Sequence, residues 1–145
     1  MDLNGIREVR AWIAEVGPFD LRTFMLSNVS IAEAGAVAML VLPRFIEYRG
    51  CVLLDFTFDE AGVDLWLERL QGERKAVEAM VNHVHLWDFF APRAEAENEV
   101  LKDLGRRMVA SWEAMALLQF PQKSFTVKFD DGSNDYGPTL AISTA

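Results

Sequence analysis

The chain of 145 residues has one cysteine, Cys51, and two histidines, His83 and His85. A single cysteine cannot form an internal disulfide bond, so a reducing, cytoplasmic setting is expected. Two histidines cannot complete a three-histidine metal site, so any metal site would need a carboxylate or the cysteine as a further ligand.

Long hydrophobic runs are also missing. The longest run, from Ala34 to Leu42, has nine residues and stops at Pro43, whereas a membrane-spanning helix needs about 20. The first residues do not place an apolar stretch behind a basic one, as a signal peptide would. We therefore expect no membrane association.

Positive charge is scarce in this chain. Lys and Arg number 14 against 22 Asp and Glu, which gives a formal charge of −8, and no stretch clusters the basic residues. Binding to nucleic acids and to anionic membranes depends on such clusters, so neither partner is expected. A basic protein partner stays open; the alternative is that the charge only keeps a small protein soluble.

The chain also lacks the motifs G-x-G-x-x-G, C-x-x-C, H-E-x-x-H and G-x-S-x-G, and it lacks a Walker loop. These motifs mark common nucleotide, redox, zinc-protease and hydrolase sites. Their absence favours a protein without catalytic activity and without a cofactor. An enzyme assembled from scattered residues stays open.

Hydrophobic residues make up 51% of the chain, enough for a sizeable core, and the length fits one compact domain over residues 1–145. Apolar residues recur at helical spacing, and Ser30 with Glu33 forms a capping-box pattern before an Ala-rich segment. We predict that this Ala-rich helix is buried and that Trp112 is buried in the longest helix. Residues 24–26 are apolar but follow no clear pattern. Helices are predicted over residues 4–17, 31–42, 59–72, 76–84 and 94–118.

Two regions of the chain change to the alternating period of strands. Residues 51–58 alternate, and Arg49-Gly50 provides a tight turn from a preceding strand. The segments SFTVKF and TLAIS form a second pair, joined by DDGSNDYGP. We predict an α+β fold, with an antiparallel sheet of about four strands packed against several helices. Its two hairpins cover about residues 45–58 and 124–143, and we expect them to share one sheet because isolated hairpins are marginally stable.

The stretch NHVHLWDFF, residues 82–90, carries both histidines. On a strand, the imidazoles of His83 and His85 would point to the same side, and Asp88 would add an oxygen ligand for iron or zinc. A histidine could also act as a general base, for example for Cys51 as a nucleophile. The more economical interpretation is that the stretch packs its apolar side chains into the core.

Acidic residues dominate two segments. Between Gly50 and Glu68 there is no Lys or Arg, and the loop over residues 130–137 is acidic as well. If both strand pairs share a sheet, these acids would form one negative surface for a basic protein. A solvated face that binds nothing is the alternative. The partner-binding candidates are Asp55, Asp59, Glu60, Asp64, Asp130, Asp131 and Asp135.

These observations rank the functional classes. We expect a small, acidic, non-catalytic interaction or regulatory protein, of which a toxin-neutralising (immunity-type) protein is one form. A homodimer is open too, because apolar helix stripes can form an interface between copies. The alternative is a metal-dependent enzyme centred on His83, His85 and Asp88.

Overall fold

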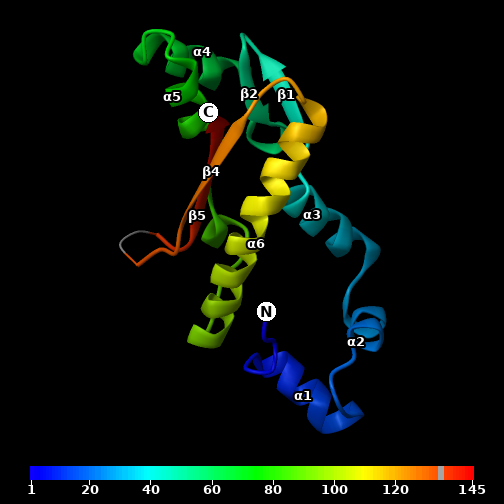
Figure 1. Cartoon of the computed structure of the whole chain (residues 1–145). Coiled ribbons are helices and arrows are strands. Elements are labelled where there is room, and N and C mark those ends of the chain that lie inside the picture. The colour runs from blue at the N-terminus through cyan, green and yellow to red at the C-terminus, as the bar shows by residue number, and fades with distance from the viewer. Residues whose placement is uncertain (134–135) are drawn as a thin grey trace.

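The computed structural model describes residues 1–133 and 136–145, and this part of the chain contains helices and strands in alternating blocks (Figure 1). Its α-helices are α1 (Arg7–Val16), α2 (Leu21–Asn28), α3 (Ile31–Val41), α4 (Glu60–Arg69), α5 (Arg74–Val81) and α6 (Glu95–Gln119). Its strands are β1 (Phe45–Tyr48), β2 (Cys51–Leu54), β3 (His83–His85), β4 (Phe125–Asp130) and β5 (Thr139–Thr144). Two short 3₁₀ helices, η1 (Asp55–Thr57) and η2 (Leu86–Asp88), follow β2 and β3.

The α+β class is confirmed, but the strands form two antiparallel sheets instead of one. Strands β1 and β2 make a hairpin whose turn residues, Arg49 and Gly50, both have positive φ as a tight hairpin turn requires. The second sheet has the order β3-β5-β4. Its edge strand β3 was not predicted, and it raises the number of strands to five in the described residues. The strand predicted over residues 51–58 ends at Leu54, where the Thr57 hydroxyl donates to the Leu54 carbonyl (3.1 Å) and closes a turn.

Two polar side chains, Glu78 of α5 and Asn82 at its C-cap, lie between the two sheets. The buried Asn82 amide donates to the carbonyl oxygens of Val52 in β2 (2.9 Å) and Ile142 in β5 (3.0 Å). The buried Glu78 carboxylate accepts from the backbone N–H of Val52 and of Thr144, each at 2.7 Å. Buried backbone groups must be paired, and here Glu78 and Asn82 supply partners that a directly neighbouring strand would have supplied.

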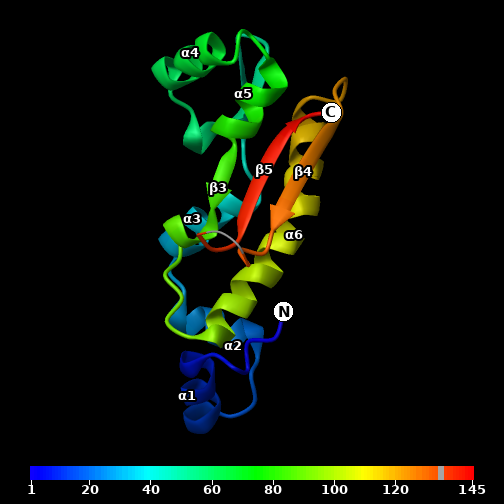
Figure 2. The ribbon, with the colours of Figure 1, turned by 90° about the vertical axis from the view of Figure 1, so that its left-hand side faces the viewer.

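Helix α6 carries the centre of the core. Met108 and Trp112 on this helix are fully buried, so the predicted burial of Trp112 is confirmed. Strand β4 lies along α6 (Figure 2), and Gly105 permits the close approach because a Cβ atom there would collide with the Phe129 ring. The predicted helix over residues 94–118 agrees with α6 within one residue at each end.

Helices α2 and α3 depart most from expectation, whereas the helix predicted over residues 4–17 is found as α1. Figures 1 and 2 show α1 and α2 at the end of the molecule opposite α4 and α5. Helix α2 was not predicted and buries no residue. The capping box of Ser30 and Glu33 is confirmed at the start of α3, but the prediction that α3 is buried is wrong, since Leu40 is its only buried residue. Helix α3 is anchored near its C-terminal end, where Trp112 and Ser111 of α6 donate to its last carbonyl groups.

Candidate functional site

The two histidines lie side by side on the edge strand β3. Their rings are 4.7 Å apart between centroids, so the predicted common direction of the imidazoles is correct. His83 is exposed and His85 is half-buried. Nδ1 of His85 lies 3.1 Å from the carbonyl oxygen of Tyr136. Because a carbonyl only accepts, Nδ1 carries the hydrogen in this contact.

Among the described residues, no third metal ligand lies beside the two histidines. Within residues 1–133 and 136–145, no group of three His, Cys, Asp or Glu side chains is arranged to hold a metal ion. Asp88 ends η2 with its side chain exposed. The structure thus brings His83 and His85 together, but it does not complete a site with Asp88 or with Cys51.

Cys51 is placed as a core residue. It is fully buried in β2 and belongs to an apolar cluster with Leu53, Val63 and Val77. Burial raises the pKa of its thiol, and the negative charge of Glu78 raises it further. A reactive cysteine needs an accessible thiolate, so this arrangement disfavours a nucleophilic role.

Part of the NHVHLWDFF stretch packs as the economical interpretation expects, but the Phe89 side chain is 48% exposed. Val84 and Leu86 are buried in the main core cluster. The Trp87 indole donates to the side chain of Asn98 on α6 (3.2 Å). Gly137, which has positive φ, lies against the Trp87 ring so closely that a Cβ atom would collide with it. These two contacts of Trp87 therefore hold η2 between Asn98 of α6 and Gly137 of the β4–β5 loop.

Two of the predicted partner-binding acids are engaged by arginines. The β1–β2 hairpin places Arg44 next to Asp55 (3.2 Å) and Arg49 next to Asp64 (2.6 Å). The hydrogen bond from Arg49 lowers the pKa of the Asp64 carboxyl. Arg44 and Arg49, which precede the segment without basic residues, therefore neutralise part of its negative charge.

The other two partner-binding candidates of that segment, Asp59 and Glu60, lie at the start of α4. Asp59 caps the helix, because its carboxylate accepts from the N–H of Gly62 at 2.7 Å. Glu60, in the first turn, is exposed. Asp59 thus has a structural task, and Glu60 is the acid of this group that stays most open to a partner.

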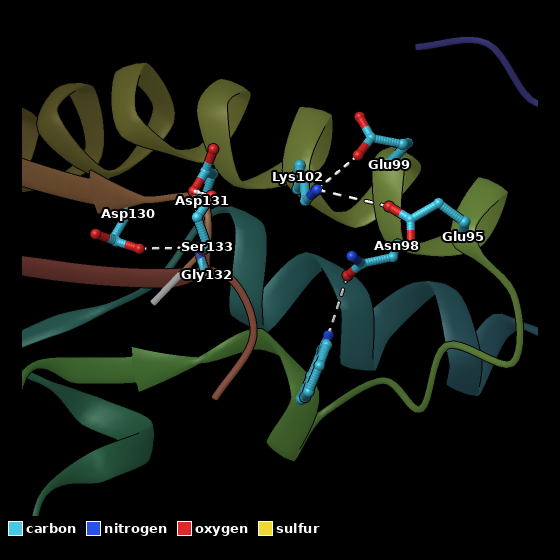
Figure 3. A network of polar contacts seen from close by, with 9 residues as sticks. Glu95, Asn98, Glu99, Lys102, Asp130, Asp131, Gly132 and Ser133 are labelled. Carbon is cyan, nitrogen blue, oxygen red and sulfur yellow. Dashed lines mark hydrogen bonds and ion pairs between the residues drawn. The ribbon is translucent and has the colours of Figure 1, made fainter. Parts of the chain in front are cut away.

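The acidic loop after β4 is a separate region. Asp130 accepts from the N–H of Gly132 (2.8 Å) and Asp131 from that of Ser133 (3.0 Å), as drawn in Figure 3. The Ser133 hydrogen bonds lower the pKa of Asp131, with smaller contributions from Lys102 and Arg106 of α6. Asp135 lies outside the described residues.

Among the described residues, the shared sheet that was expected to join the two acidic segments is not formed. The expectation depended on both strand pairs sharing a sheet, and they lie in two. Both ribbon views place α4 at one end of the molecule and the β4–β5 loop well below it (Figures 1 and 2). The acids of residues 55–64 therefore lie in a different part of the molecule from Asp130 and Asp131 of the loop.

The most unusual surface was missed by the sequence analysis. From residue 21 to residue 39 no side chain is buried, although both helices in this span are rich in apolar residues. A helix that is apolar on all sides is normally enclosed. We call this region the α2–α3 apolar surface; its exposed large side chains are Leu21, Met25, Leu26, Val29, Ile31, Val37, Met39 and Leu42.

Two hollows belong to the α2–α3 apolar surface. A hollow of about 640 Å³ lies between α2 and α3 and is lined mainly by apolar side chains, among them Met25, Val37 and Val41. A second hollow of about 360 Å³ lies on another side of α3, where Met39 faces Phe89. Such hollows can receive projecting apolar side chains of a partner.

No single helix among residues 1–133 and 136–145 has the length and apolarity needed to cross a membrane. Helices α2 and α3 reach that length and composition only when taken together, and they are bent by 115° at the break between them.

Comparison with known proteins identifies no relative, because no protein-family model, no curated protein and no solved structure matches the chain significantly.

Proposed function

We propose that this protein is a non-catalytic interaction module that works through the α2–α3 apolar surface. The observation that supports this most is the absence of any buried side chain between residues 21 and 39, in a segment with eight exposed large apolar side chains over residues 21–42. Full burial of one such side chain is worth about 1.5–3 kcal/mol. A partner that covers this surface would therefore gain a large apolar contribution to binding.

The surface is held in shape before any partner binds. Asp20 caps α2 by accepting from the N–H of Thr23 (2.8 Å), and the capping box of Ser30 and Glu33 fixes the start of α3. Helices of this length are marginal on their own, so these caps contribute to a preformed surface. Preformed binding surfaces lose less conformational entropy on association.

Ring contacts attach α2 to the preceding helix. Phe24 packs against Trp12 of α1, with 5.5 Å between ring centroids, and against Phe19 at 5.3 Å. These contacts use one side of α2 and leave Leu21, Met25 and Leu26 exposed. The apolar surface is thus supported from one side and open on the other.

The net negative charge of the chain indicates which kind of protein the partner would be. A formal charge of −8 favours encounter with a basic protein, as a regulatory or toxin-neutralising (immunity-type) protein in the cytoplasm would need. Exposed acids such as Glu60, which lies outside the α2–α3 apolar surface, would supply that attraction.

A capture experiment with matched baits tests the proposal. The tagged chain is recovered from cells that express it naturally, and co-purified proteins are identified by mass spectrometry. Leu26→Gln with Ile31→Gln is the test bait, and Leu118→Gln is the control, because Leu118 is also highly exposed (75%) but lies in α6. We expect a partner with the wild-type and control baits and its loss with the test bait. Equal recovery by all three baits would reject the α2–α3 apolar surface as the binding site.

A second candidate function, a metal-dependent enzyme, is favoured by the paired imidazoles of His83 and His85. Zinc or iron bound to the native protein would raise its melting temperature. A rise in the wild type that disappears in both His83→Ala and His85→Ala would favour this candidate. An unchanged melting temperature in all three proteins would remove it.

A further inference from the structure

On the basis of the function proposed above, we infer that the α2–α3 apolar surface of one molecule is covered by the same surface of a second copy of this chain, in a two-fold symmetric homodimer. Three properties of the surface support this occupant: its area, its charge and its shape.

The area of the surface matches what a stable dimer buries. At about 100 Å² for a fully exposed large aliphatic side chain, its eight side chains, which are 36% to 90% exposed, present roughly 500 Å² of apolar surface. A standard interface buries about 800 Å² per partner, of which about 60% is apolar. The largest apolar patch of an ordinary monomer covers about 300–600 Å² and is often functional. One copy of the surface is therefore large enough for one side of a dimer.

The charge of the surface suits a second copy. Within residues 21–42 the charged side chains are Arg22 and Glu33, one of each sign, while the whole chain carries −8. Two acidic molecules repel one another except where a neutral surface lets them approach. A basic protein would find no excess of acids on this segment, and an anionic membrane would repel the chain and find a single arginine there.

The surface carries both projecting side chains and a hollow. A two-fold interface uses the same surface on both copies, so that surface must carry both projecting and receiving parts. Leu26 and Ile31 are its most exposed large side chains, at 85% and 90%, and they flank the bend between α2 and α3. The hollow of about 640 Å³ between the same two helices provides the receiving part. Each copy can thus insert its bend into the hollow of the other.

Sedimentation equilibrium of the full chain tests the dimer. We expect a mass of twice 16.4 kDa for the wild type. Leu26→Gln and Ile31→Gln should each weaken the dimer by about tenfold or more, and together they should give a monomer. Glutamine retains good helix propensity, and both side chains are exposed, so unchanged circular dichroism should confirm that the variants fold. Leu118→Gln should remain a dimer.

Two results would overturn this inference. A wild-type chain that stays monomeric at its highest soluble concentration would exclude the second copy as the occupant. A dimer, or a larger assembly, that survives the Leu26→Gln, Ile31→Gln double substitution would place self-association on another surface. The proposed function would still stand in the first case if the capture experiment recovers a different protein only with an intact surface, so the two failures are distinguishable.

Discussion

The indole N–H of Trp112 on α6 donates to the carbonyl oxygen of Leu40 at the end of α3, at a distance of 2.9 Å. The neighbouring Ser111 hydroxyl donates to the carbonyl oxygen of Val41 at 2.7 Å. The last carbonyl groups of a helix have no partner within the helix, and here α6 supplies two. These bonds fix one end of α3 to the core, and the rest of α3 projects from that anchor.

The first prediction concerns this anchor. Trp112→Phe retains much of the buried ring but leaves the Leu40 carbonyl unpaired, so we expect a loss of about 1–3 kcal/mol in the free energy of unfolding. Trp112→Ala should cost about 3–5 kcal/mol, as expected for a buried aromatic side chain. Urea unfolding measures both. Trp66→Phe is the control, because Trp66 is only half-buried; an equal loss in Trp66→Phe and Trp112→Phe would argue against the anchor.

The second prediction concerns the link between the two sheets. Asn82→Ala removes the partners of the Leu54 N–H and of the Val52 and Ile142 carbonyls, all at 2.8–3.0 Å. We expect a loss of about 2–4 kcal/mol on urea unfolding, since buried polar groups would be left unpaired. Asn28→Ala is the matched control at an exposed position and should change stability by less than about 0.5 kcal/mol. Similar losses in the two variants would contradict the linking role of Asn82.

The third prediction concerns the reactivity of Cys51. Its thiol is buried and has a raised pKa, so a disulfide reagent should react with it only after the protein unfolds. The rate should therefore follow the population of unfolded protein as urea is added. The control is Cys51→Ser with Leu118→Cys, which moves the thiol to an exposed position. Equally fast reaction of both proteins without urea would show that Cys51 is accessible.

The fourth prediction concerns pH. Because the hydrogen bond from Arg49 lowers the pKa of Asp64 in the folded protein, this pair stabilises the fold above the ordinary carboxyl pKa near 3.8. The contribution is lost as the pH falls through the lower pKa of the folded state. A side-chain carboxyl titration by NMR should place the Asp64 midpoint below 3.8 in the wild type and near it in Arg49→Gln. The same midpoint in both proteins would exclude the pairing in solution.

Much of the local structure could be predicted because short-range patterns determine it. The capping box of Ser30 and Glu33 fixes where α3 begins, and the turn at Arg49-Gly50 fixes the β1–β2 hairpin. The long apolar stripe of α6 made the burial of Trp112 predictable. In each case the residues that specify the feature are close together in the chain.

Features that depend on distant residues could not be predicted. Nothing local shows that Asn82 bridges β2 and β5, or that Val84 pairs with Leu140 in the sheet. In the sequence, Asp55 and Asp64 looked unpaired. The fold of the β1–β2 hairpin brings Arg44 and Arg49 next to them.

The error at α3 has a different cause. An apolar sequence predicts burial, and it cannot tell burial within one molecule from burial against another. The apolar residues of the Ala-rich segment fit either outcome, and the fold encloses Leu40 alone among those of α3. The exposed remainder is what led to the α2–α3 apolar surface and to the function proposed for it.

Site-specific photo-crosslinking in cells that naturally express the protein tests the central claim most directly. A photoreactive amino acid replaces Leu26 in the α2–α3 apolar surface or, as the control, Leu118 in α6; both positions are highly exposed. We predict one discrete crosslinked product from position 26, with the mass of two copies if the second copy is the occupant, and none from position 118. No product from position 26, or the same products from both positions, would contradict the claim that this surface binds a partner.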